Sequence, residues 1–263
     1  GCPVAGRTEM KKNKRVVLGM SGGVDSSVAA VVLMEQGYEV IGVTLKLLPC
    51  EMANPGDQKT CCSQQDAMDA MSVCGRLGID LKVLNLESEF QNLIISPFVD
   101  EYMNCRTPNP CISCNEHMKF GAMLRYARDT VGADYIATGH YARVIDKDGR
   151  KVLSSGSDQA KDQTYFLYSL GQKTLEHLLF PIGEMEKSEV RRIARDNGLS
   201  IADKQESQEI CFAAGRSYVE FLETFGGVKQ RPGPIVLEDG TRLGTHLGLY
   251  RHTIGQRKGL GVS

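Results

Sequence analysis

Apolar residues recur along the first part of the chain with spacings that predict alternating strands and helices. Val16 to Gly19 is a short β-branched run without a helical period, which is typical of a buried strand. Ser26 to Gln36 is rich in Ala, Val and Leu and predicts a helix that ends before Gly37. Tyr38 to Leu45 predicts a second strand. A strand–helix–strand unit of this length indicates a parallel pair with a right-handed crossover.

The same alternation continues beyond the second strand. Gln64 to Leu77 has apolar residues on one helical face, among them Cys74, and predicts an amphipathic helix. Leu81 to Leu86 predicts a third strand, and Asp134 to His140 is strand-like. The sequence therefore predicts an α/β fold with a parallel sheet that binds a nucleotide at the carboxyl ends of its strands.

The later elements are shorter. Tyr141 to Leu153 predicts a hairpin that turns at Asp148-Gly149. Lys161 to Leu167 begins with polar residues and reads as the opening of a helix. Lys187 to Asn197 predicts a helix with Val190, Ile193 and Ala194 inward and with Lys187, Arg191, Arg192 and Arg195 on a solvated face.

The segment Ser21-Gly22-Gly23-Val24-Asp25-Ser26-Ser27 joins the first strand to its helix. Two glycines let a backbone approach a ligand closely, and the N-terminus of a helix favours an anion. No lysine stands between Gly19 and Ala30, so this is not a Walker loop. The segment resembles the pyrophosphatase loop of ATP enzymes that transfer AMP, which indicates that it binds ATP.

Charge and cysteine content narrow the class of protein. The formal net charge is −1, so contact with RNA must come from local basic patches. The nine cysteines form no regular framework and indicate reactive or metal-binding thiols, with Cys74 a core residue and adjacent Cys61 and Cys62 structural. Gly1 to Lys14 reads as a loose tail. No apolar run approaches a membrane span, and we expect a cytoplasmic protein.

A second motif runs from Cys105 to Gly121. Its prolines stiffen a loop, and Cys114 stands at the entry of a predicted helix. The nearby Lys119 and Arg106 favour a thiolate there. The alternatives are half of a zinc site or a pair of buried cysteines. His140, at the end of a predicted strand, is either a structural histidine or part of the site.

Six motifs in order, SGGVDSS, RTPNPxxxCN with KFG, ATGHYAR, KDQTYFLY, SQEICF and GQRKGLG, resemble the tRNA-specific 2-thiouridylase family over Val16 to Val262. The resemblance implies an adenine-nucleotide α-hydrolase-like (Rossmann-like) catalytic domain. It also implies that ATP adenylates O2 of the wobble uridine in tRNA, that sulfur attacks, and that AMP leaves. The implied cofactors are ATP and Mg²⁺, and the implied partners are tRNA and a sulfur-donor protein.

The family's functional positions transfer by motif. Cys114 matches the nucleophilic cysteine and Cys211 the cysteine that carries the persulfide, with Asp25 expected beside Mg²⁺. The ATP-binding positions are Gly19, Met20, Ser21, Gly22, Gly23, Val24, Asp25, Ser26, Leu45 and Gly139. The tRNA-binding positions are Asn109, Pro110, Cys111, His140, Lys161, Asp162 and Gln163.

Two features depart from the family pattern. Many relatives have aspartate at the position of Cys111 and glycine at that of Cys105. Cys111, Cys114 and Cys211 could together hold a 4Fe-4S cluster, so thiolation through such a cluster stands beside the persulfide route. The second departure is length: after the catalytic domain at 15–213, residues 214–263 read as the start of a β-rich domain without the family's C-terminal barrel.

Two other classes of protein remain open from the residues. An ATP-pyrophosphatase amide ligase needs the ATP loop but not Cys114 and Cys211, so thiol dependence distinguishes it. A non-catalytic RNA- or metal-binding module descended from the enzyme would retain tRNA binding without turning ATP over to AMP.

Overall fold

The sheet at the centre of the protein has five parallel strands in the order β3-β2-β1-β4-β7. The computed structural model describes residues 14–49, 64–205, 210–213 and 216–262. The strands are β1 (Arg15–Gly19), β2 (Glu39–Lys46), β3 (Asp80–Asn85), β4 (Tyr135–Ala137) and β7 (Leu178–Leu179). Because they are parallel, their carboxyl ends meet at one edge, and the predicted α/β fold is confirmed.

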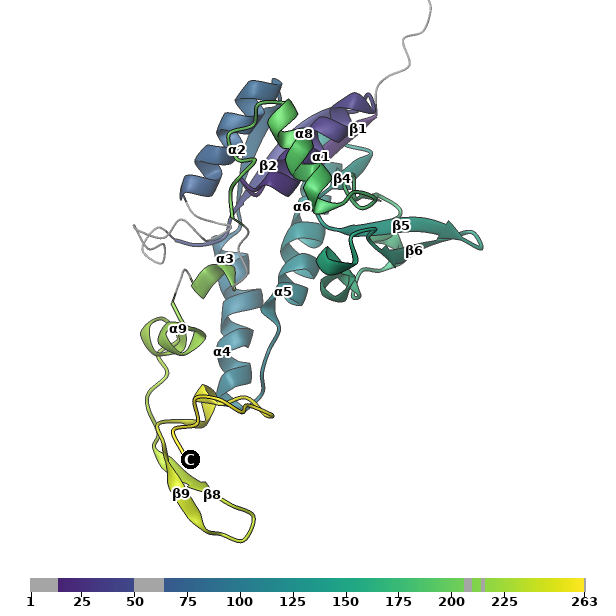
Figure 1. The fold of residues 1–263 in the computed structure, drawn as a ribbon. Coiled ribbons are helices and arrows are strands. Elements are labelled where there is room, and N and C mark those ends of the chain that lie inside the picture. Colours follow the sequence, from purple (N-terminus) through teal and green to yellow (C-terminus); the bar gives the residue numbers. More distant parts are fainter. Residues whose placement is uncertain (1–13, 50–63, 206–209, 214–215, 263) are drawn as a thin grey trace, which may run out of the picture.

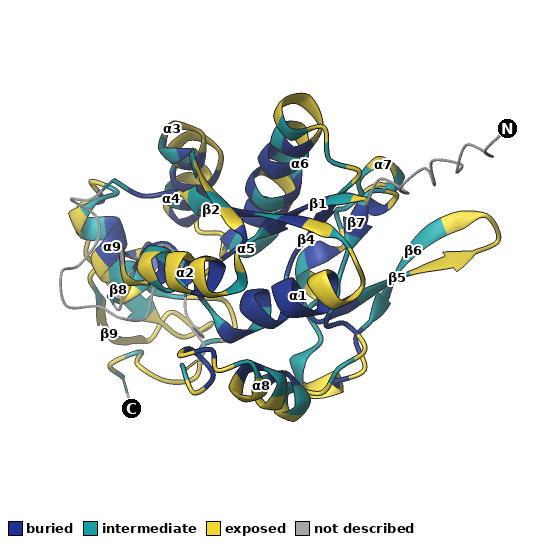
Figure 2. Cartoon of the chain, turned by 90° about the horizontal axis from the view of Figure 1, so that it is seen from above, coloured by how far each residue is buried: buried dark blue, intermediate teal, exposed yellow. Residues whose placement is uncertain are grey.

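Helices cover both faces of this sheet (Figure 1). Seen from above, α1 (Val24–Glu35), α2 (Gln64–Leu77) and α8 (Lys187–Asp196) lie on one side and the helix containing α6 (Met123–Tyr126) on the other (Figure 2). The alternation of β1 sets the layers: Val16 and Leu18 pack in the cluster with α1 and α8, whereas Val17 packs in the cluster with Met123.

The helix on the second face consists of consecutive segments α5 (Pro110–Ser113), η2 (Cys114–Ala122), α6 and η3 (Ala127–Val131), of which η2 and η3 have wider π-type turns. Pro110 suits its first turn because proline has no N–H to satisfy there, and the Asn109 side chain accepts from the Cys111 N–H at 3.2 Å. The helix thus begins one turn before the predicted start, and Cys114 lies inside it.

A separate apolar cluster lies beyond the sheet edge. It joins α3 (Glu87–Phe90), η1 (Gln91–Ile95) and α4 (Ser96–Met103) to η6 (Cys211–Ala213), α9 (Tyr218–Thr224) and η7 (Leu249–Arg251). Phe98 is its centre, with ring centroids 5.0 Å from Phe212 and 6.3 Å from Phe221. These aromatic edge-to-face contacts attach the C-terminal segments to the helices that follow β3.

Two hairpins extend from the body, β5–β6 (Ala142–Lys147, Arg150–Ser155) and β8–β9 (Gly233–Val236, Arg242–His246). Asp148 and Gly149 both have positive φ (52° and 75°), the conformation of a two-residue hairpin turn, so this predicted turn is confirmed. The second hairpin lies within the predicted β-rich segment. Between the hairpins lie η4 (Gln159–Lys161), η5 (Thr164–Leu167) and α7 (Gln172–Leu175).

Several predicted boundaries are wrong. The first helix begins at Val24 rather than Ser26, and β4 is shorter than predicted. The helix predicted from Lys161 is instead a pair of 3₁₀ turns, because Asp162 has an extended ψ of 128° and accepts from the Thr164 hydroxyl at 2.6 Å. Cys61, Cys62 and most of the predicted tail lie outside the described residues.

No helix in the described ranges has both the length and the apolar character needed to cross a membrane.

Candidate active site

The loop between β1 and α1 is held by its own serines. The Ser26 and Ser27 hydroxyls donate to the Gly23 carbonyl at 3.1 and 2.9 Å, and the Ser21 N–H donates to Ser26 Oγ at 3.2 Å. Gly23 is extended and precedes the first turn of α1, where N–H groups have no partner within the helix. The loop is therefore shaped before a ligand arrives, with helix donors facing the strand end.

Two glycines let neighbouring backbone come close to this loop. A Cβ on Gly22, whose φ is +72°, would lie 2.2 Å from the Asp66 carbonyl oxygen. A Cβ on Gly139, just after β4, would lie 2.6 Å from the backbone of Asp25 and Ser26. Gly139 is thus part of the loop's wall, and the cradle fits the phosphates of a nucleotide.

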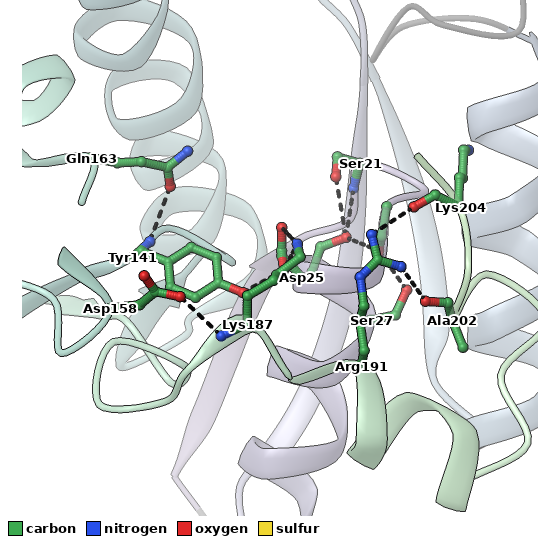
Figure 3. Close-up of polar contacts among 12 residues, drawn as sticks. Ser21, Asp25, Ser27, Tyr141, Asp158, Gln163, Lys187, Arg191, Ala202 and Lys204 are labelled. Carbon is green, nitrogen blue, oxygen red and sulfur yellow. Dashed lines mark hydrogen bonds and ion pairs between the residues drawn. The ribbon is translucent and has the colours of Figure 1, made fainter. Parts of the chain in front are cut away.

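Asp25 has a cation partner within the protein. Lys187 Nζ lies 2.7 and 2.9 Å from its two carboxylate oxygens, and the Tyr141 hydroxyl donates to it at 2.9 Å (Figure 3). The Lys187 side chain is 12% exposed, and its backbone N–H donates to Asp158 at 3.1 Å. The prediction that Lys187 lies on a solvated face is wrong, because the start of α8 points toward the ATP loop.

Lys204 approaches the same loop from the other side. Its Nζ donates to the Gly22 carbonyl at 3.0 Å and lies 2.6 and 2.5 Å from the carboxylates of Asp66 and Asp69. Burial opposes its charge, but hydrogen bonds to the two carboxylates outweigh burial and raise the pKa of Lys204. A loop without a lysine of its own therefore has two lysines from distant segments beside it.

Arg191 supports the segment that contains Lys204. Its guanidinium donates to the carbonyls of Ala202 at 2.6 Å and Lys204 at 3.2 Å (Figure 3). Arg191 thus binds the chain of its own protein instead of extending into solvent, and for this residue too the predicted solvated face is wrong. Sequence analysis missed Lys187, Lys204 and Asp66 because no local pattern distinguishes them from ordinary surface charges.

Cys114 and Cys211 belong to one apolar cluster although they are far apart in the sequence. Cys114 is 7% exposed, and Cys211 and Leu45 are partly buried against the same cluster. Cys111 is half-buried in the turn before Cys114. Arg106, predicted near Cys114, instead pairs with Glu101 at 2.5 and 2.7 Å. The described surroundings of the Cys114 thiol are the apolar side chains of this cluster.

The three cysteines do not form a metal site. Among the described residues, which include Cys111, Cys114 and Cys211, no group of three or more His, Cys, Asp or Glu side chains is close enough together to hold a metal ion. A single metal ion bound by all three thiols therefore does not fit this arrangement.

His140 lies in an aromatic setting. Its ring centroid is 5.7 Å from that of Phe120 and 6.1 Å from that of Phe180, and its Nδ1 is 2.7 Å from the Thr138 hydroxyl. Burial, followed by the charge of Lys119, holds the pKa of His140 well below its usual value. The imidazole is therefore neutral near pH 7.

The segment that contains Lys161, Asp162 and Gln163 is hydrogen-bonded on one side to Tyr141, beside the ATP loop, and on the other to the residue after Cys114. The Gln163 side-chain oxygen accepts from the Tyr141 N–H at 3.0 Å, and the Gln163 N–H donates back to the Tyr141 carbonyl at 3.0 Å. Tyr141 in turn contacts Asp25. The Asn115 side chain, next to Cys114, donates to the Phe166 carbonyl at 3.0 Å.

The parallel sheet and its serine- and glycine-rich loop define a nucleotide-binding α/β protein of the HUP class. The family model described as "tRNA methyl transferase HUP domain" matches residues 14–215, and "tRNA methyl transferase PRC-barrel domain" matches 219–263. A 4-thiouridine synthetase–RNA complex with bound ATP has a similar fold, with a TM-score of 0.51 and 21% identity over 81% of this chain and 50% of that chain.

Curated relatives define the family more narrowly. The tRNA-specific 2-thiouridylase MnmA of Geotalea uraniireducens is 52% identical over 256 residues, which cover 96% of this chain and 68% of the relative. That of Clostridium acetobutylicum is 47% identical over 251 residues, or 95% of this chain and 70% of the relative. The chain belongs to the tRNA-specific 2-thiouridylase family.

Proposed function

We propose that the protein is an ATP-dependent tRNA-uridine 2-sulfurtransferase. Uridine O2 attacks the α-phosphorus of ATP, and pyrophosphate leaves, which converts a poor leaving group into AMP. The terminal sulfur of a Cys211 persulfide then attacks C2, and AMP departs. The Cys114 thiolate attacks Cys211 Sγ, breaking the sulfur–sulfur bond to the base and leaving 2-thiouridine. The resulting Cys114–Cys211 disulfide takes two electrons from an external thiol reductant.

The observation that carries this proposal is the joint packing of Cys114 and Cys211 in one cluster that also includes Leu45 at the end of β2. Disulfide formation needs two Cβ atoms within about 4.5 Å, so the two thiols must share one neighbourhood. A family relationship at about half identity supports the same assignment.

The substrates follow from the same site. ATP would occupy the loop Gly19–Ser26 with Leu45 and Gly139 as neighbours, and Mg²⁺ would enter bound to its phosphates. The wobble uridine of tRNA would lie near Asn109, Pro110, Cys111 and His140, with Lys161, Asp162 and Gln163 beside it. A sulfur-donor protein would load Cys211. Because both thiols must be reduced before each turnover, we assign the protein to the cytoplasm.

The persulfide route needs only Cys114 and Cys211, whereas the iron–sulfur alternative needs Cys111 as a third ligand and a cofactor as well. An amide ligase is also less well supported, since such an enzyme has no use for two thiols at the site. Both alternatives predict measurable outcomes that differ from the persulfide route.

The proposal is tested by tRNA thiolation with ATP, a persulfide donor and a thiol reductant, and 2-thiouridine is quantified by mass spectrometry. We expect the wild-type protein to thiolate tRNA without added iron, and Cys114→Ser and Cys211→Ser each to stop thiolation. Activity that survives either change would reject the cysteine pair. Activity that tracks iron content, with matching absorption in the visible range, would favour the cluster.

A further inference from the structure

Two large aromatic side chains are left in solvent beside the candidate site. Tyr165 is 65% exposed and Tyr168 is 68% exposed, and no other aromatic side chain in the described ranges is among the exposed large hydrophobic residues. Tyrosine usually buries its ring because the ring is largely apolar. An adjacent exposed pair therefore points to a ligand that covers it.

The local backbone places the two rings on one face. Tyr165 lies within the 3₁₀ turn η5, and Tyr168 follows directly after it. Residues three apart eclipse each other in a 3₁₀ turn, and the two ring centroids are 6.5 Å apart. Leu167, between them in the sequence, is completely buried. The turn is thus anchored on one side while it presents both tyrosines on the other.

This turn is fixed relative to Cys114. Asn115, which follows Cys114, is 2% exposed and donates from its side-chain amide to the Phe166 carbonyl at 3.0 Å. The turn also packs against η2, the helical segment that begins at Cys114, and against β6. The aromatic face therefore belongs to a turn that contacts the helix containing the candidate nucleophile.

We propose that Tyr165 and Tyr168 form a stacking platform for unpaired bases of the tRNA next to the target uridine. This inference rests on the proposed function. An unpaired loop offers bases with two free faces, and aromatic side chains are the usual surface on which proteins stack them. The pair thereby positions the flanking nucleotides while the uridine enters the site.

The test measures binding of an anticodon stem–loop RNA to the wild-type protein and to Tyr165→Ala and Tyr168→Ala at one fixed salt concentration. Stacking contributes about 1–3 kcal/mol per base, so each alanine variant should bind about 5- to 150-fold more weakly. Tyr165→Phe and Tyr168→Phe keep a ring and should bind within about twofold of wild type. The matched control is Met71→Ala on α2, whose side chain is 62% exposed.

Two further readouts separate stacking from a structural role. Neither tyrosine carries charge, so the alanine variants should keep the salt dependence of binding and the wild-type affinity for ATP. An abasic replacement of the stacked nucleotide should weaken wild-type binding and leave Tyr165→Ala with no further loss.

Wild-type RNA binding by both alanine variants would overturn the platform, as would equal loss with the phenylalanine variants. RNA binding that is unchanged while sulfur transfer from a donor protein falls, with a small-molecule persulfide still accepted, would assign the surface to that donor instead. If the wild-type protein binds RNA through the tyrosines but never thiolates it, the proposed function fails and the platform stands.

Discussion

At the scale of single residues, Asp25 and Lys187 form a pair in which each group depends on the other. The lysine is nearly buried, and both carboxylate oxygens of Asp25 face it. Removing either partner leaves a charge without its neighbour at the start of α1, in the wall of the ATP site.

Asp25→Ala should abolish pyrophosphate release while the protein stays folded, because the change removes a loop carboxylate without opening a core cavity. Lys187→Met should have a similar effect, and the double variant should be no worse than either single one, since both changes break one interaction. Pyrophosphate release and circular dichroism measure the two properties. Lys82→Met, at an exposed position, is the control, and normal release by a folded Asp25→Ala protein would contradict this role.

Cys74 offers a contrast to the proposed reactive pair. It is 2% exposed, packs in the cluster with α1, and burial raises its pKa to about 11, so it stays a thiol at neutral pH. Cys74→Ser should lower the free energy of unfolding by about 1–3 kcal/mol, because it buries a hydroxyl in an apolar site. Thiolation by the folded fraction should be unchanged. Urea unfolding measures the stability and the thiolation assay measures the activity. A folded but inactive Cys74→Ser variant would contradict the assignment of Cys114 and Cys211 as the reactive pair.

His140 gives the fold a predictable pH dependence. Its folded pKa is depressed, so the unfolded chain binds a proton first as the pH falls. The free energy of unfolding should therefore decrease below about pH 6.5, by up to about 1.4 kcal/mol per pH unit from this group. His140→Gln should have a shallower decline between pH 6.5 and 5 in urea titrations. If the free energy of unfolding falls equally with pH in the wild-type and His140→Gln proteins, His140 does not cause the loss of stability.

At the scale of elements, the start of the helix at Pro110 changes how Cys111 is understood. Cys111 follows the Asn109 cap in the first helical turn, where an acidic side chain interacts favourably with the helix dipole. Cys111→Asp should therefore preserve the helix and thiolation, with at most a shifted pH optimum. Loss of thiolation together with bound iron would contradict that expectation.

Cys105 supplies the matched control for this experiment. It has a φ of +59° and is exposed, a conformation that glycine adopts without strain. Cys105→Gly should be close to neutral in both thermal unfolding and thiolation.

The sequence predicted elements well where the pattern was local. The buried runs of β1 and β2, the apolar face of α2 and the Asp148-Gly149 turn all depend on neighbours in the chain. It failed where a distant partner decides. Lys187 and Arg191 have the spacing of surface residues, yet they bind Asp25 and the Ala202 carbonyl, and no local pattern encodes those contacts. The polar start at Lys161 suggested a helix because the Asp162–Thr164 hydrogen bond could not be foreseen.

At the scale of the whole molecule, Lys204 connects three regions: the ATP loop, α2 and the segment before Cys211. Lys204→Met would leave Asp66 and Asp69 near each other without this cation, and we expect a loss of about 3 kcal/mol in the free energy of unfolding. The Michaelis constant for ATP should rise as well, because the Gly22 carbonyl loses its donor. Lys204→Arg should recover much of both losses. Urea unfolding and ATP-dependent pyrophosphate release are the measurements. An unchanged free energy of unfolding and an unchanged Michaelis constant in Lys204→Met would show that these contacts contribute to neither property.

The position of Lys204 also limits where Cys211 can lie. Cys211 follows seven positions later (211 − 204), and a chain of that length reaches at most roughly 25 Å when fully extended. Because Lys204 is hydrogen-bonded to the Gly22 carbonyl, Cys211 stays within about that distance of the ATP loop. Cys211 is also partly buried against the apolar cluster that contains Cys114, so the sulfur that we propose it carries would be used close to where it is loaded. On the proposed route, a donor protein that loads Cys211 would therefore approach the protein on the side where the ATP loop lies.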